Sequence, residues 1–122
     1  MHTDLQVYKE SMLLVKDIYD LTRSFPKDEQ WALTSQMKRA VISIPSNLAE
    51  GSGRRSSKEL SHFLNISLGS LSELETQIEI ANILGFIEDK SMTEPIIARL
   101  NSVKRMLVAL QKRVTTPPLS SK

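Results

Sequence analysis

Apolar residues recur at helical spacing through four long segments of this 122-residue chain, and breakers separate the segments. Glycine and proline cluster at residues 25–26, 51–53, 85–95 and 117–118. Between these clusters the apolar steps of three and four residues follow one helix face, and no stretch alternates as a strand does. The pattern predicts an all-α, single-domain, antiparallel up-and-down four-helix bundle over residues 1–114, with helices near 4–23, 26–50, 57–84 and 93–113 and a flexible polar tail at 115–122.

Local signals add detail to this bundle. Ser56 and Glu59 have the S-x-x-E spacing of a capping box, which predicts a helix start at that point. Pro26 suits the opening turn of the second helix, where the acidic residues that follow it complement the positive end of the helix dipole. Gly69 lies inside the third helix, where it predicts the close approach of a neighbouring helix.

The composition excludes several classes of protein. The chain has no cysteine and two histidines, so it can form neither a disulfide framework nor a Cys-based zinc site nor a thiolate nucleophile. No apolar run is long enough to span a bilayer, and the first residues lack the basic and apolar regions of a signal peptide. We therefore expect a cytoplasmic protein that makes no membrane contact.

Three patterns that could indicate an enzyme are incomplete. Glu59 and His62 have the Glu-x-x-His spacing of paired-metal helical bundles, but that chemistry needs two such motifs and further inward carboxylates. The basic turn at residues 51–55 lacks the ending of a phosphate-binding P-loop, and no G-x-S-x-G turn is present. We predict no catalytic residue, no metal and no cofactor, and a metal-dependent enzyme centred on Glu59 and His62 stays the third hypothesis.

Polar residues form a row on the second helix and another on the third, each beside the core-facing positions. Arg39 and Glu73 have opposite charges and could pair across the two helices. Either the rows are solvated faces, or they form a structural polar network within the bundle or between subunits. The residues of this candidate network are Gln36, Arg39, Ser43, Asn47, Glu50, Ser70, Glu73 and Gln77.

The first helix is apolar over an arc of about 200°, wider than a surface helix needs. Two interpretations remain: the helix is deeply wrapped within one bundle, or part of the arc is a subunit interface. The first row of the arc is Leu5, Tyr8, Met12, Val15 and Tyr19, and the second row is Val7, Leu14, Ile18 and Leu21.

Basic residues concentrate near the end of the sequence. Residues 91–122 hold six basic residues and one acidic residue, whereas residues 1–90 hold 10 basic and 13 acidic residues. This asymmetry favours a polyanionic partner, although a basic face that only keeps the protein soluble has the same composition. The candidate nucleic-acid-binding residues are Arg54, Arg55, Lys58, Arg99, Lys104, Arg105, Lys112 and Arg113.

Two longer motifs give a resemblance. The runs Asn47-Leu48-Ala49-Glu50-Gly51 and Gly69-Ser70-Leu71-Ser72-Glu73-Leu74-Glu75-Thr76-Gln77 resemble the four-helix-bundle family encoded in intervening sequences of bacterial 23S ribosomal RNA genes. The resemblance implies a ring-shaped homopentamer. It also implies kinship with accessory proteins of diversity-generating retroelements, which bind nucleic acid and a reverse transcriptase. It supplies no catalytic residues, and its motif residues fall on the two polar rows.

The sequence thus predicts a non-enzymatic, oligomeric helical bundle that binds RNA or DNA electrostatically or serves as an accessory protein. The alternative is a protein-interaction scaffold without direct nucleic-acid contact. In that case the apolar arc and the polar rows would serve assembly and a protein partner.

Overall fold

The computed structural model describes the backbone of residues 2–115 and the side chains of residues 6–115. It contains the helices α1 (His2–Thr22), α2 (Leu33–Ser52), α3 (Ser57–Ile83) and α4 (Glu94–Thr115). Short 3-10 helices, η1 (Lys27–Glu29) and η2 (Lys90–Met92), lie in two of the connections. The predicted all-α class is confirmed. Thr115 ends α4, and the rest of the predicted tail lies outside the described residues.

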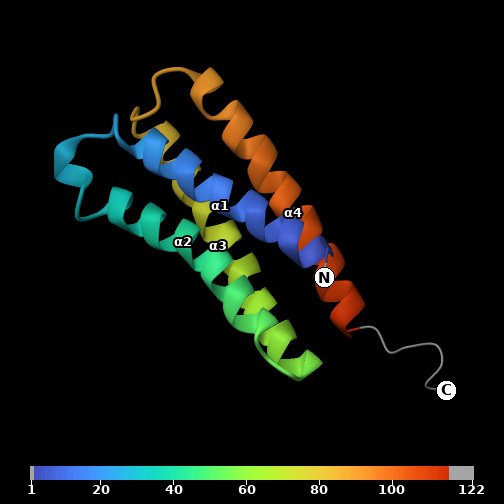
Figure 1. Cartoon of the computed structure of the whole chain (residues 1–122). Coiled ribbons are helices and arrows are strands. Elements are labelled where there is room, and N and C mark those ends of the chain that lie inside the picture. The colour runs from blue at the N-terminus through green and yellow to red at the C-terminus, as the bar shows by residue number, and fades with distance from the viewer. Residues whose placement is uncertain (1, 116–122) are drawn as a thin grey trace.

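The four helices pack side by side as one bundle. The chain runs up and down in alternation, so that α2, α3 and α4 are each antiparallel to the helix before (Figure 1). Each helix packs on its sequence neighbours, and α4 closes the bundle by packing on α1. Of the helices in the described part of the chain, none is long and apolar enough to cross a membrane.

The start of the second helix differs from the prediction. We expected a helix from residue 26, but α2 begins at Leu33, and residues 27–29 form η1 instead. None of the η1 residues is buried, so a longer helix would have no apolar face to dock there. Ala32, with φ −120° and ψ −106°, is the break before α2, and the Glu29 side chain accepts a hydrogen bond from the Leu33 N–H at 3.4 Å.

The core lies along the inner faces of all four helices. On α1 the second apolar row supplies it: Val7, Leu14, Ile18 and Leu21 are all at most 4% exposed. In the first row Tyr8 and Val15 pack against the edge of the core, whereas Met12 is 46% exposed. The wide apolar arc of α1 is therefore not fully wrapped within a single chain. The largest fully buried side chains of the other helices are Met37, Val41, Ile44, Leu64, Leu71, Leu74, Leu100, Leu107 and Leu110.

Gly51, and not Gly69, marks the close approach of two helices. A Cβ atom at Gly51 would lie 2.9 Å from the Phe63 Cβ and 3.0 Å from the Leu60 Cδ1, whereas a Cβ at Gly69 would meet nothing within 4 Å. The prediction for Gly69 is wrong because that position faces outward. The α2 and α3 helices approach closely at Gly51, near the turn that joins them, where a Cβ atom would not fit without a shift.

Candidate nucleic-acid interface

The turn between α2 and α3 carries three exposed basic residues. The side chain of Ser56 accepts a hydrogen bond from the Glu59 N–H at 3.0 Å, so the predicted cap of α3 is confirmed. Arg54 lies 5.2 Å from the centre of the Phe63 ring and pairs with Glu50 at 3.3 Å. Both members of that pair are largely exposed, so it restrains Arg54 only weakly. Arg55 and Lys58 are exposed beside it.

The last turns of α4 lie against the first turns of α3. The Gln111 side chain donates hydrogen bonds to the Ser61 carbonyl, at 3.1 Å, and to the side chain of Asn65. Lys112 and Arg113 follow directly and are exposed, as are Lys104 and Arg105 nearer the middle of α4. Residues 104–115 contain no acidic residue.

These contacts bring the α2–α3 turn and the second half of α4 into the same half of the molecule, which we call the basic end. Figure 1 shows the α2–α3 turn and the C-terminal part of α4 at the same end of the bundle. The residues of the basic end are Arg54, Arg55, Lys58, Lys104, Arg105, Lys112 and Arg113. In this half of the bundle (residues 6–12, 43–67 and 104–115) eight residues are basic and three acidic; in the other half (13–42 and 68–103) seven are basic and ten acidic.

Arg99 does not belong to the basic end. Its guanidinium pairs with Asp17 at 2.6 Å and with Glu10 at 3.5 Å, and its side chain is 32% exposed. Because both carboxylates are on α1, Arg99 clamps α4 to α1, and its charge is already matched. We therefore omit this predicted residue from the interface proposed below.

The predicted polar network forms in part. Ser70 donates to the Ser43 hydroxyl at 2.8 Å, and the Asn47 amide donates to the Ser43 carbonyl at 2.8 Å and to its hydroxyl at 2.9 Å. Periodicity did not identify Ser67, which is fully buried and donates to the Ile44 carbonyl at 2.9 Å. These bonds join the middle of α2 to the middle of α3.

The remaining network residues are not joined to this cluster. Gln36, Arg39 and Glu73 line a cleft of about 250 Å³ beside the serine pair. Within residues 6–115 no ion pair joins Arg39 to Glu73, so that predicted contact is absent. Gln77 is 4% exposed, and its Oε1 has no hydrogen-bond partner in the described part of the chain. Glu50, already paired with Arg54, lies outside the cleft.

The Glu59 and His62 positions show no grouping of metal ligands. Glu59 belongs to the helix cap, where its carboxylate accepts from the Ser56 hydroxyl at 3.3 Å. His62 is exposed, with its ring 5.3 Å from that of Phe63. In the described range no three His, Cys, Asp or Glu side chains come together in a way that could hold a metal ion.

Comparison with known proteins identifies the family. The model of the family described as 23S rRNA-intervening sequence protein matches residues 3–109. The chain belongs to this family. The match spans all four helices, so the resemblance in the two motifs extends to the bundle as a whole.

One solved structure has the same fold as this chain. It is a protein with unknown function from the S23 ribosomal protein family of Bacteroides thetaiotaomicron, 22% identical in sequence. The alignment covers 90% of this chain and 98% of that chain, with a TM-score of 0.81. None of the curated proteins compared with the chain matches it. The comparisons therefore show the family and the fold.

Proposed function

We propose that this chain is a non-enzymatic, oligomeric helical bundle that binds RNA or DNA by electrostatic contact with phosphates. The observation that carries the proposal is the basic end, in which seven exposed basic side chains from a turn and a distant helix lie in the same half of the bundle. Arginine and lysine contacts to phosphate are independent of base sequence, and the few aromatic residues of the chain favour backbone contact over base stacking.

A salt titration tests this proposal directly. Fluorescence anisotropy with a labelled single-stranded RNA and a labelled DNA duplex measures the binding constant at several salt concentrations. Each phosphate neutralised adds about 0.7–0.9 to the negative slope of log K against log salt concentration, so four contacts give a slope of roughly −3. Absence of binding at low salt, or binding without salt dependence, would contradict the proposal.

A matched pair of triple variants locates the interface. The test variant carries Arg55→Gln, Arg105→Gln and Arg113→Gln at the basic end. The control carries Arg23→Gln, Lys27→Gln and Lys90→Gln, three exposed cations in the other half of the bundle. Both lose the same charge, so only a local interface predicts a weaker affinity and a smaller slope in the first variant alone. Equal losses in the two variants would indicate a response to net charge.

The oligomer is the second part of the proposal. An apolar groove of about 390 Å³ lies between α1 and α2, lined by Tyr8, Met12, Val15, Ile42 and Pro45 among others. Met12 and Ile42, which both line the groove, are each more than 40% exposed, so large apolar side chains from two helices form one exposed patch. We place a second copy of the chain against this face, in the homopentamer that the family resemblance implies. Multi-angle light scattering tests it, and a monomeric mass at micromolar concentration would contradict it.

A protein-interaction scaffold is the second candidate function, and the same apolar groove supports it. In this case a partner such as a reverse transcriptase, as in the retroelement accessory proteins that the family resembles, would occupy the groove. The basic-end triple variant separates the two functions. A scaffold keeps its partner when those charges are removed, whereas a nucleic-acid binder loses its ligand.

A further inference from the structure

A second concave site lies in the half of the bundle opposite to the basic end. It is a cavity of about 320 Å³ between the end of α3 and the start of α4, beneath the loop that joins them. Its size is within the range of small-molecule sites. Its lining residues are Ile78, Glu79, Asn82, Ile87, Lys90, Thr93, Glu94 and Ile97.

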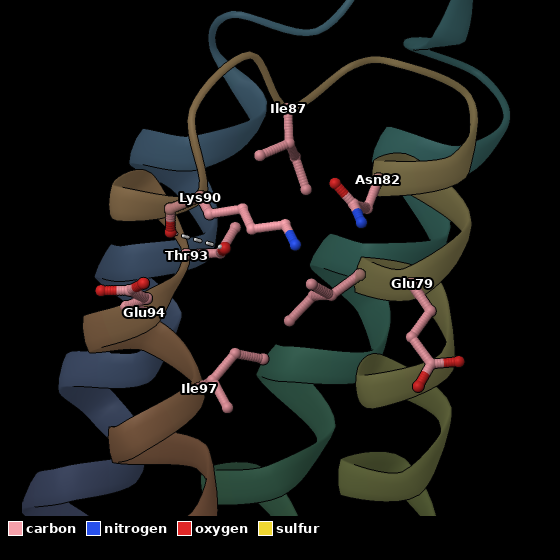
Figure 2. Close-up of a pocket in the computed structure, with 8 residues that line it drawn as sticks. Glu79, Asn82, Ile87, Lys90, Thr93, Glu94 and Ile97 are labelled. Atoms are coloured by element: carbon pink, nitrogen blue, oxygen red, sulfur yellow. Dashed lines mark hydrogen bonds between the residues drawn. The ribbon is translucent and has the colours of Figure 1, made fainter.

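The cavity combines three isoleucines with polar side chains, among which Lys90 and Asn82 are the nitrogen-bearing groups. Ile78 from α3, Ile87 from the loop and Ile97 from α4 line the space. Figure 2 shows Ile87 above it and Ile97 below it. Figure 2 shows the Lys90 side chain reaching across the opening toward Asn82. Within the described residues neither the Lys90 ammonium nor the Asn82 amide has a hydrogen-bond or ion-pair partner. Both are hydrogen-bond donors directed to one place.

The loop above the cavity is held in place at several points. Gly85, with φ +80°, ends α3 with a turn that few other residues could adopt. Phe86 then packs on Phe25 of the α1–α2 connection, with ring centres 5.5 Å apart. Asp89 caps η2 by accepting from the Ser91 N–H at 3.0 Å.

The backbone of Lys90 is fixed from the other side as well. The Thr93 hydroxyl donates to the Lys90 carbonyl at 3.1 Å, shown as the dashed line in Figure 2. The backbone of Lys90 is therefore already ordered in the 3-10 helix, so little backbone entropy is lost when its ammonium binds a ligand.

We propose that this cavity binds a small aliphatic monocarboxylate. The carboxylate meets the Lys90 ammonium and the Asn82 amide, and the branched hydrocarbon body lies among Ile78, Ile87 and Ile97. An ammonium and an amide N–H match a carboxylate group, while the three isoleucines exclude water from the tail. The carboxylates of Glu79 and Glu94 at the rim repel any anion, and they repel a multivalent anion such as phosphate more strongly than a singly charged carboxylate.

The test uses 4-methylpentanoate as the probe and the full chain labelled with ¹⁵N. Saturable amide shifts are expected at residues 78–97, with a dissociation constant of about 1 mM for a ligand of this size. The neutral analogue 4-methylpentanamide should bind roughly tenfold more weakly because it lacks the charge. Leucine carries the same tail and carboxylate, and saturable binding of either acid at this site supports the proposal.

Lys90→Met supplies the decisive variant, and Lys27→Met is its control. Both lysines are exposed and each begins a 3-10 helix, but only Lys90 borders the cavity. Loss of roughly tenfold in affinity is expected for Lys90→Met alone, with both variants retaining the parent melting temperature. Equal binding of the acid and the amide, shifts outside residues 78–97, or unchanged affinity in Lys90→Met would overturn the proposal.

Discussion

Two glycines on neighbouring helices permit a matched test of how closely α2 and α3 pack. The perturbation is Gly51→Ala, and Gly69→Ala is its control. The new Cβ at position 51 would lie 2.9 Å from the Phe63 Cβ, whereas the one at position 69 would meet nothing within 4 Å. Because the Phe63 Cβ is attached directly to the α3 backbone, the clash cannot be relieved by a side-chain rotation. The two helices have to move apart.

The expected magnitudes follow from that geometry. Replacing a helical glycine by alanine stabilises a helix by about 0.5–1 kcal/mol. Overpacking of a close contact costs about 1–3 kcal/mol. Gly69→Ala should therefore raise the free energy of unfolding by about 0.5–1 kcal/mol. The free energy of unfolding of Gly51→Ala should be about 1–3 kcal/mol lower than that of Gly69→Ala. In a domain of this size 1 kcal/mol corresponds to about 3–6 °C in melting temperature.

Thermal and urea unfolding followed by far-UV circular dichroism measures both variants against the parent chain. Comparing the two alanines cancels most of the propensity gain, so the difference reports the clash alone. The reasoning is refuted when Gly51→Ala melts as high as Gly69→Ala with the same urea m-value. That result would mean that α2 and α3 separate at their joining turn without cost.

Three further outcomes are expected from single side chains. Arg99→Met should lower the free energy of unfolding by about 1 kcal/mol, measured by urea titration, because it leaves two partly buried carboxylates of α1 without their cation. Ser67→Ala should cost about 1 kcal/mol in the same assay, because the bond to the Ile44 carbonyl is lost. The Ser91 N–H, as donor to Asp89, holds the pKa of that carboxyl below its ordinary value. The stabilising effect is therefore complete above about pH 4 and is lost as the pH falls through the lowered pKa. Asp89→Ala should accordingly reduce the decline in melting temperature on acidification.

The number and order of the helices were predictable because they depend on a repeated signal. Each helix buries one apolar stripe. Because many residues contribute to a stripe, the helix is still recognised when one of them departs from the pattern. The starting point of α2 depends on a few residues that contribute no buried side chain, so no periodic signal marks it. The capped start of α3 was predictable because Ser56 and Glu59 are close in sequence and their contact is local.

Contacts between distant residues were not predictable in the same way. Asp17 and Arg99 are 82 positions apart in the sequence. The sequence alone does not distinguish an arginine that forms an ion pair within the fold from one that is free to bind phosphate. The two apolar rows of α1 are likewise equivalent in sequence, and only the positions of α2 and α4 decide that Val7 and Leu14 are buried while Met12 is not. For the candidate interface, the sequence predicted the residue types, and the fold decided which of them come together.

The distribution of charge along the bundle also predicts how the proposed oligomer responds to salt. Within residues 6–115, the half of the bundle with the basic end holds eight basic and three acidic residues, and the other half holds seven basic and ten acidic residues. In a ring of parallel subunits the basic ends are neighbours and repel, so added salt screens the repulsion and strengthens assembly. In an antiparallel arrangement each basic end meets a more acidic end, so added salt weakens assembly. Sedimentation velocity at low and high salt distinguishes the two arrangements. For a parallel ring we expect added salt to strengthen assembly. Nucleic acid bound to the basic ends should strengthen it in the same way at low salt. Assembly that is insensitive to salt would contradict the role assigned to the axial charge.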